Sequence, residues 1–257
     1  MHLHLPNRGG FLFIVSLLAV LSQGAPSQAQ LYELRTYVTN EGKLDDLNAR
    51  FRDHTVELFE KHGMKSIGYW VPTDGPSASN TLIYVIEHKD AEAAKASWRA
   101  FLQDPQWQQA YRQSEADGPI LSKPPESVYM RLTDYSSMLE EVDENQEAVY
   151  ELRIYRTNEG KLPNLDARFR DHTIRLFDRH GMKSVAYWHP TDEPASNDTL
   201  IYILRHDSRD AAKQSWQAFV KDEDWRKAAR ESEKDGRFLR ERPEVVYMKP
   251  TDYSAIK

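Results

Sequence analysis

The chain has 257 residues, enough for one large domain or two of ordinary size, and 40% of them are hydrophobic, so a packed core is expected and wholesale disorder is not. The formal net charge of -6 and the lack of a long basic run argue against nucleic-acid binding, which requires a basic surface. The absence of cysteine excludes disulfides, thiolate zinc sites and a cysteine nucleophile.

Residues 1–29 are predicted to be a secretory signal peptide. The apolar run from Phe11 to Leu21 has the length of a signal core and is short for a bilayer span. Ser27 and Ala29 suit the −3 and −1 positions of a cleavage site, so the mature chain would begin at Gln30. An uncleaved anchor and a mitochondrial presequence are alternatives, although a presequence should be richer in arginine. We therefore expect a secreted or periplasmic protein with no transmembrane segment after signal removal.

The rest of the chain is a tandem repeat with an offset of 118 residues. YELRTY at Tyr32 returns as YELRIY at Tyr150, and the FRDHT that begins at Phe51 returns at Phe169. All six tryptophans form pairs at this offset, no insertion is needed, and roughly three positions in five are identical. A period above a hundred residues is the size of a domain. The predicted organisation is a first domain at 30–136, an acidic linker at 137–149 and a second domain at 150–257.

Each unit has the same predicted elements in chain order. YELRTYVT is typical of a strand, and from Leu44 to His62 apolar residues recur at helical spacing until Gly63, a typical helix C-cap. MKSIGYW and TLIYVIEH are the next two strands, AEAAKASWRAFLQD and WQQAYRQSEAD are helical, and SVYMRL is the last strand. The order β-α-β-β-α-β predicts an α+β ferredoxin-like domain, with helices on one face of an antiparallel sheet.

The other face of each sheet is predicted to need a partner. A bare, partly apolar sheet face is unstable in water. Two fused copies can cover each other, so we expect an intrachain pseudo-dimeric α/β barrel. This expectation does not exclude assembly of several chains into a higher oligomer.

Several motifs resemble the NIPSNAP family. They are YELRTY, the following Gly-Lys-Leu, KHGM, GYW and DPQW in the first unit, and YELRIY, RHGM, AYW and DEDW in the second. The resemblance covers nearly the whole mature chain and implies the dimeric α/β-barrel superfamily. Members of that superfamily include small monooxygenases, isomerases and haem-handling enzymes, which typically work between sheet and helices. NIPSNAP domains have no firmly assigned chemistry. Eukaryotic relatives are mitochondrial, and the export signal of this chain departs from them.

The first strand of each unit carries a polar set on one face. Side chains alternate across a strand, so Glu33, Arg35 and Tyr37 point one way while Tyr32 and Leu34 point the other. The apolar set is predicted to lie under the helices and the polar set to face the barrel interior, where the buried charges must pair. This polar set would be either a structural network or the floor of a ligand cavity. The second unit repeats it as Glu151, Arg153 and Tyr155.

Histidines form the next candidates. At about 100° per residue, His54 and its copy His172 lean toward the sheet, where a partner such as Tyr37 or a ligand is expected. His62 precedes a glycine and is expected to cap its helix. His54 and His62 are too far apart for both to bind one metal directly, and no HExxH spacing exists, so no metal site is predicted. A metal held with two carboxylate partners is the alternative that this spacing leaves open.

The remaining motifs add little chemistry. Trp70, Trp98 and Trp107 are expected in the core, with an aromatic pocket as the alternative. No phosphate loop, dinucleotide glycine pattern or GxSxG elbow is present, so no cofactor is predicted.

Two functions remain open. The first is a small-molecule-binding or scaffold protein, with a ligand in the barrel. The second is a small barrel enzyme, monooxygenase- or isomerase-like, on an aromatic or lipidic substrate. In that enzyme the histidine of each unit would transfer protons, the tyrosine would orient the substrate and the arginine would stabilise an oxyanion. These candidates are His54, His172, Tyr37, Tyr155, Arg35 and Arg153. A barrel pocket open to His54 would favour the enzyme, and a packed interior with Glu33 paired to Arg35 would favour the scaffold.

Overall fold

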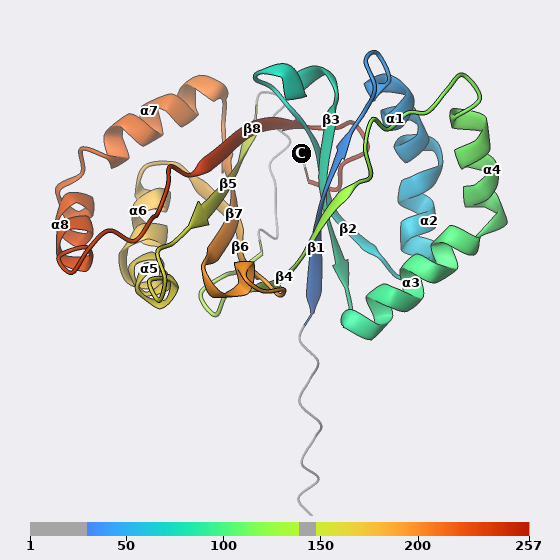
Figure 1. The fold of residues 1–257 in the computed structure, drawn as a ribbon. Coiled ribbons are helices and arrows are strands. Elements are labelled where there is room, and N and C mark those ends of the chain that lie inside the picture. Colours follow the sequence, from blue (N-terminus) through green and yellow to red (C-terminus); the bar gives the residue numbers. More distant parts are fainter. Residues whose placement is uncertain (1–29, 139–147, 257) are drawn as a thin grey trace, which may run out of the picture.

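The computed structural model describes residues 30–138 and 148–256 (Figure 1). The predicted signal peptide at 1–29 and residues 139–147 of the predicted linker lie outside these ranges. Within the described ranges, no helix is both long enough and apolar enough to cross a membrane.

The first unit follows the predicted β-α-β-β-α-β order, with each helical part divided. Its first helix runs continuously from α1 through a π-helical turn, η1, into α2, and its second helical part is α3 and α4. A short 3-10 helix, η2, precedes β3. The bounds are β1 (Leu31–Val38), α1 (Leu44–Arg50), η1 (Phe51–Thr55), α2 (Val56–Lys61), β2 (Lys65–Pro72), η2 (Pro76–Ser79), β3 (Thr81–His88), α3 (Ala91–Gln103), α4 (Pro105–Ser114) and β4 (Glu126–Leu132).

The second unit repeats these elements at the same offset. Its first strand starts at Val149, which is buried, so the strand takes the last residue of the predicted linker. The bounds are β5 (Val149–Arg156), α5 (Leu162–Arg168), η3 (Phe169–Thr173), α6 (Ile174–Arg179), β6 (Lys183–Pro190), η4 (Ala195–Asn197), β7 (Thr199–His206), α7 (Arg209–Phe219), α8 (Glu223–Ser232) and β8 (Glu244–Pro250).

The eight strands form one closed antiparallel barrel. The strand order is β1-β3-β2-β8-β5-β7-β6-β4, and the two units join where β2 pairs with β8 and β4 pairs with β6. The helices of each unit lie outside the barrel, at opposite ends of the long dimension in Figure 1. The predicted pseudo-dimeric α/β barrel is therefore confirmed, and its closure removes every free sheet edge.

Apolar side chains from both units fill the barrel interior. Tyr32 of one unit meets the ring of Trp188 of the other at 6.0 Å, and Trp70 meets Tyr150 at 5.6 Å. Both tryptophans are fully buried. Strand residues of both units complete this core, among them Leu34, Ile83, Val85, Met130, Leu152, Val185, Ile201, Ile203 and Met248.

The predicted orientation of the polar strand residues is wrong. Tyr32 and Leu34 face the interior, whereas Glu33 and Tyr37 lie under the helices, where Trp98 of α3 donates to Glu33 and Phe51 packs on Tyr37. The physical reason is that the interior is lined mainly by apolar side chains, whereas the helical layer supplies donors to the carboxylate. The same correction applies to Arg35 and to the second set, Glu151, Arg153 and Tyr155.

Each unit also sends its C-terminal tail across to the other. Tyr253 donates to Asn48 at 2.7 Å, and in the opposite direction Tyr135 donates to Asp166 at 2.7 Å. The hydroxyl of Ser136 accepts from the backbone of Tyr187 at 2.9 Å, as Ser254 does from Tyr69. These crossed tails lock the two helical layers to the barrel.

Candidate functional site

A buried carboxylate organises the layer between sheet and helices in the first unit. One oxygen of Glu33 accepts from Arg35 and from Ser127, each at 2.6 Å. The other accepts from Trp98 at 2.7 Å and lies 2.9 Å from Nε2 of His88. Glu33 and His88 have no exposed surface. Four donors therefore satisfy the carboxylate of Glu33 completely, which is the condition for a stable buried charge.

The pKa of Glu33 shows which effect dominates. Burial alone would raise this pKa, but hydrogen bonds from His88, Ser127 and Trp98 and the charge of Arg35 outweigh it and lower the pKa from 4.5 to about 2. The group is thus ionised across the physiological range. A carboxylate with this pKa and no free lone pair is a poor general base.

The second unit contains the same network with one donor exchanged. Glu151 accepts from Arg153 at 2.7 Å and from Trp216 at 2.6 Å, and lies 2.8 Å from His206. Burial opposes ionisation here too, but these partners lower the pKa of Glu151. Position 245, the equivalent of Ser127, is valine and donates nothing, but Tyr247 hydrogen-bonds to Glu151 instead.

Arg35 and Tyr37 extend this network toward the helices. The guanidinium of Arg35 lies 4.4 Å above the ring of Trp98, and its Nη2 donates to the hydroxyl of Tyr37 at 3.5 Å. Tyr84 also donates to that hydroxyl, at 3.2 Å. The predicted pairing of Glu33 with Arg35 is therefore confirmed, although on the helical side of the sheet. Arg153 stacks on Trp216 in the same way.

A π-helical turn displaces His54 from its predicted position. In η1 the backbone amide of Val56 donates to Phe51, five residues back, and the hydroxyl of Thr55 donates to Arg50. The wider turn inserts one residue, so Thr55 takes the inward position and His54 is exposed. The prediction that His54 leans toward the sheet is wrong for this reason. The identical turn η3 exposes His172.

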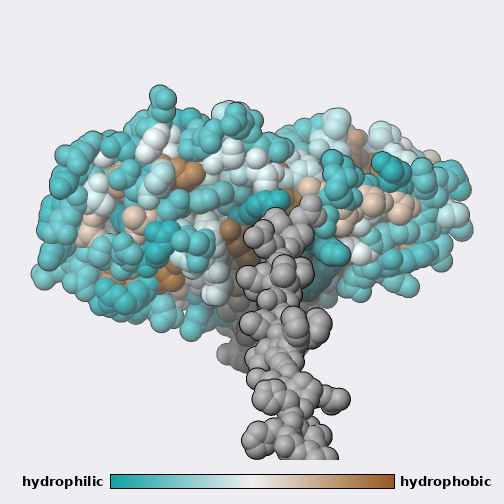
Figure 2. Space-filling model, turned by 90° about the horizontal axis from the view of Figure 1, so that it is seen from below, coloured by the Kyte–Doolittle hydropathy of each residue, from teal (hydrophilic) through white to brown (hydrophobic). Residues whose placement is uncertain are grey.

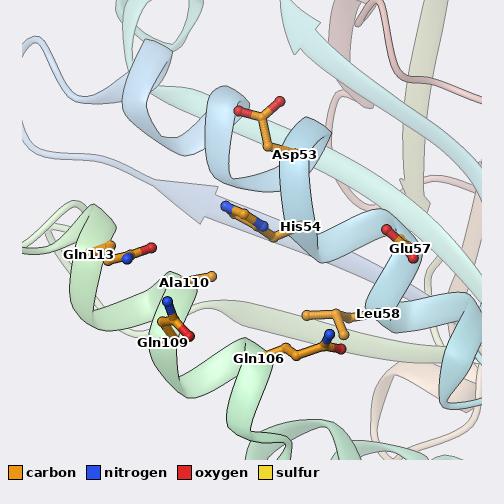
Figure 3. Close-up of a pocket in the computed structure, with 8 residues that line it drawn as sticks. All are labelled: Asp53, His54, Glu57, Leu58, Gln106, Gln109, Ala110 and Gln113. Carbon is orange, nitrogen blue, oxygen red and sulfur yellow. The ribbon is translucent and has the colours of Figure 1, made fainter.

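His54 opens into a groove between the first helix and α4 (Figure 3). The groove has two adjoining parts of about 240 and 300 Å³, which share His54, Asp53, Ala110 and Gln113. In Figure 3 the imidazole points into the space between the two helices. The walls carry amides and carboxylates, namely Gln106, Gln109, Glu57, Asp46 and Asp117. Such a lining offers many hydrogen bonds.

His172 opens into the equivalent groove of the second unit, of about 360 Å³. Ala228, the equivalent of Ala110, lines this groove beside Asp171 and Ser232. Three amides of the first groove, at 106, 109 and 113, are replaced by Asp224, Lys227 and Glu231. The two grooves thus share their centre and differ at their rim.

The structure separates the predicted catalytic residues into two places. Arg35 and Tyr37 contact each other under the helices, whereas His54 lies on the exposed side of the first helix, and no contact within the described ranges joins His54 to either of them. Their joint catalytic role stays a prediction without the geometry that it requires. The same separation holds for Arg153, Tyr155 and His172.

Other candidates have structural contacts. His62 lies 2.8 Å from the carboxylate of Asp104, which caps α4, so it links two helix ends as expected of a capping residue. Trp70 belongs to the barrel core, while Trp98 and Trp107 pack at the margin of the helical core.

Sequence reasoning assigned no role to His88 or to the glutamines of α4. For His88 the available signal was that it and Glu33 are both repeated in the second unit, as His206 and Glu151. The i, i+3, i+7 spacing of Gln106, Gln109 and Gln113 was a signal for the glutamines.

The sequence model of the NIPSNAP family matches the chain twice, at residues 32–137 and 150–255. The chain belongs to the NIPSNAP family. The family model thus matches both units of the repeat, and no curated protein matches this NIPSNAP chain.

Solved structures share its barrel. A "putative monooxygenase" from Fusobacterium nucleatum superposes with a TM-score of 0.59 and 9% identity over 86% of this chain and 92% of that chain. An anthrone oxidase-like protein gives 0.53 and 10% identity over 86% and 91%. An uncharacterised NIPSNAP domain protein from Burkholderia xenovorans is 22% identical over 41% of this chain and 96% of that chain, with a TM-score of 0.35. At such identities, the first two show that the fold is shared and nothing more.

Proposed function

We propose that this NIPSNAP protein is an exported small-molecule-binding protein in which the barrel is a scaffold and each helical layer carries a ligand groove. The observation that carries the proposal is the π-helical turn. In both units it exposes the histidine of FRDHT to a groove instead of burying it against the sheet. π-helical turns distort a helix and occur frequently at functional sites.

The packed interior supports a scaffold role for the barrel. Two tryptophans and two tyrosines meet at its centre, and Glu33 and Glu151 are committed to buried networks. Of the residues in the described ranges, those around the grooves of the helical layer are the better placed to meet a ligand from solvent.

The lining of the first groove favours a ligand rich in hydroxyl or amino groups. Arg50 is paired with Glu115, and Lys43 with Asp46, so the remaining charges of Asp53, Glu57 and Asp117 make the groove acidic. Glutamine amides and an imidazole can each donate or accept. The ligand class is therefore a polyol or a small amine.

Native mass spectrometry of the purified protein tests this proposal. We expect bound small molecules whose occupancy falls in His54→Ala or in His172→Ala, depending on the groove. Tyr37→Phe is the matched control, because Tyr37 is buried under the helices and lines neither groove. Occupancy that survives both histidine substitutions would contradict the proposal.

The alternative function is an oxygen-dependent enzyme acting on an aromatic substrate. The specific observation in its favour is the shared fold with the anthrone oxidase-like protein and the "putative monooxygenase". Oxygen uptake with anthrone as the probe distinguishes the two functions. A binding protein gives no uptake above buffer, whereas uptake abolished by Arg35→Met would establish the enzyme.

Export is part of the proposal and has its own test. The protein is produced in a bacterial host with its own N-terminus, and the intact mass is measured. Cleavage after Ala29 leaves a chain that begins at Gln30, and this mass should be found in the periplasmic or secreted fraction. A full-length mass in the membrane fraction would instead indicate an anchor.

A further inference from the structure

We propose a second site, outside the histidine grooves, that binds a small carboxylate with an aromatic body. It is a groove of about 520 Å³ between α6, the start of β6 and the tail of the first unit that crosses to the second. Its lining is Tyr135, Arg170, Ile174, Arg175, Asp178, Lys183 and Ser184.

One wall is rigid and partly apolar. Tyr135 comes from the first unit, donates to Asp166, and stacks on Phe169 of the second unit at 6.4 Å. Ile174, which packs at the edge of the same core, forms the neighbouring surface. A flat ring can lie against these two side chains without any rearrangement of the tail.

The positive charges of the groove differ in how they are held. Nη2 of Arg170 donates to both carboxylate oxygens of Asp134, at 2.7 and 2.8 Å, so the charge of Arg170 is largely offset. Arg175 is exposed and has no acidic partner among the described residues. Lys183 lies 3.8 Å from Asp178, a long contact between two exposed side chains. Arg175 and Lys183 are therefore available to an anion, and Arg175 can hold a carboxylate with two hydrogen bonds.

The equivalent surface of the first unit has the opposite character. Glu57 stands where the second unit has Arg175. Lys65, the equivalent of Lys183, is paired with Glu87 at 3.4 Å. This surface would repel an anion, so the chain carries a matched control for the site.

The test is a ligand-observed NMR titration of the purified protein with phenylacetate at low ionic strength. We expect binding with a Kd on the order of millimolar, as suits a ligand of this size on an open groove. Phenylacetamide, which has the same ring and no charge, should bind at least about tenfold more weakly, because a charge-assisted hydrogen bond is lost.

Variants locate the binding. Arg175→Glu copies the first unit and should weaken phenylacetate by at least about tenfold, and Lys183→Gln should weaken it by a smaller factor. Lys65→Gln, at the position of the first unit equivalent to Lys183, should leave the affinity unchanged, because Lys65 lines neither the proposed site nor a histidine groove. Equal affinity for phenylacetate and phenylacetamide, an unchanged Kd in Arg175→Glu, or no binding at millimolar concentration would each overturn the proposal. Because none of these residues is His54 or His172, failure here leaves the histidine grooves untouched.

Discussion

The two units keep their buried networks and change their surfaces. Glu33 and Glu151 have the same arginine, histidine and tryptophan partners, with distances that differ by no more than 0.1 Å. The grooves on the helical layer, in contrast, replace glutamine with charged residues and one glutamate with arginine. The duplication therefore preserves the buried layer between sheet and helices and leaves the groove-lining positions free to diverge.

One difference in the partners of the buried carboxylates breaks this pattern. The fourth partner of Glu33 is the hydroxyl of Ser127, whereas Val245 replaces this serine in the second unit and Tyr247 hydrogen-bonds to Glu151 instead. The two carboxylates thus differ in the identity of one partner, and this difference can be measured.

Removal of either carboxylate should have the largest effect on stability. Glu33→Ala leaves Arg35, His88 and Trp98 without their common acceptor, so the free energy of unfolding should fall by about 3–5 kcal/mol. Glu151→Ala should cost about the same, because Tyr247 supplies the fourth partner there. Urea denaturation measures both. In a Ser127→Val background the cost of Glu33→Ala should fall by roughly 1 kcal/mol, the contribution of one hydrogen bond, and an unchanged cost would show that Ser127 contributes nothing.

The pH dependence of stability should reveal the same carboxylate. The pKa of Glu33 is about 2 when folded and near 4.5 when unfolded, so the unfolded state binds the proton more readily at acid pH. The stabilisation is complete above about pH 5 and disappears as the pH falls through 2, with a total on the order of 3 kcal/mol. In Glu33→Gln the corresponding slope of unfolding free energy against pH should be absent. Parallel curves for the two proteins would show that folding does not lower the pKa of Glu33.

The fold was predictable from the sequence because its signals are periodic and doubled. Strand alternation, the helix from Leu44 and the bare sheet faces all led to the barrel. The orientation of the first strand was not predictable from alternation alone, because both of its faces are buried. Which face met the interior depended on partners such as Trp98 and His88, far away in the sequence.

The prediction that His54 leans toward the sheet was wrong for a different reason. A regular helix of 3.6 residues per turn places this ring toward the sheet, and nothing in the spacing of apolar residues announces a π-helical turn. The groove residues of α4 belong to a helix that meets the first one only in the folded chain, so no local pattern pairs them with His54.

The smallest expected effect concerns the crossed tails. The acceptor of the tyrosine hydroxyl is charged in one of them and neutral in the other. Tyr135 donates to the carboxylate of Asp166, and Tyr253 donates to the amide of Asn48, both at 2.7 Å. A hydrogen bond to a charged acceptor contributes about 1.5–3 kcal/mol and one between neutral groups about 1 kcal/mol. Tyr135→Phe should therefore lower the free energy of unfolding more than Tyr253→Phe does, by about 1 kcal/mol, in the same urea experiment.

His189, which also contacts Asp166 at 3.0 Å, can keep that carboxylate partly satisfied and so reduces the difference. His189→Val, which copies Val71 of the first unit, should widen the gap between the two tyrosine variants, and a gap that stays closed would mean that the charge of Asp166 does not strengthen this tail.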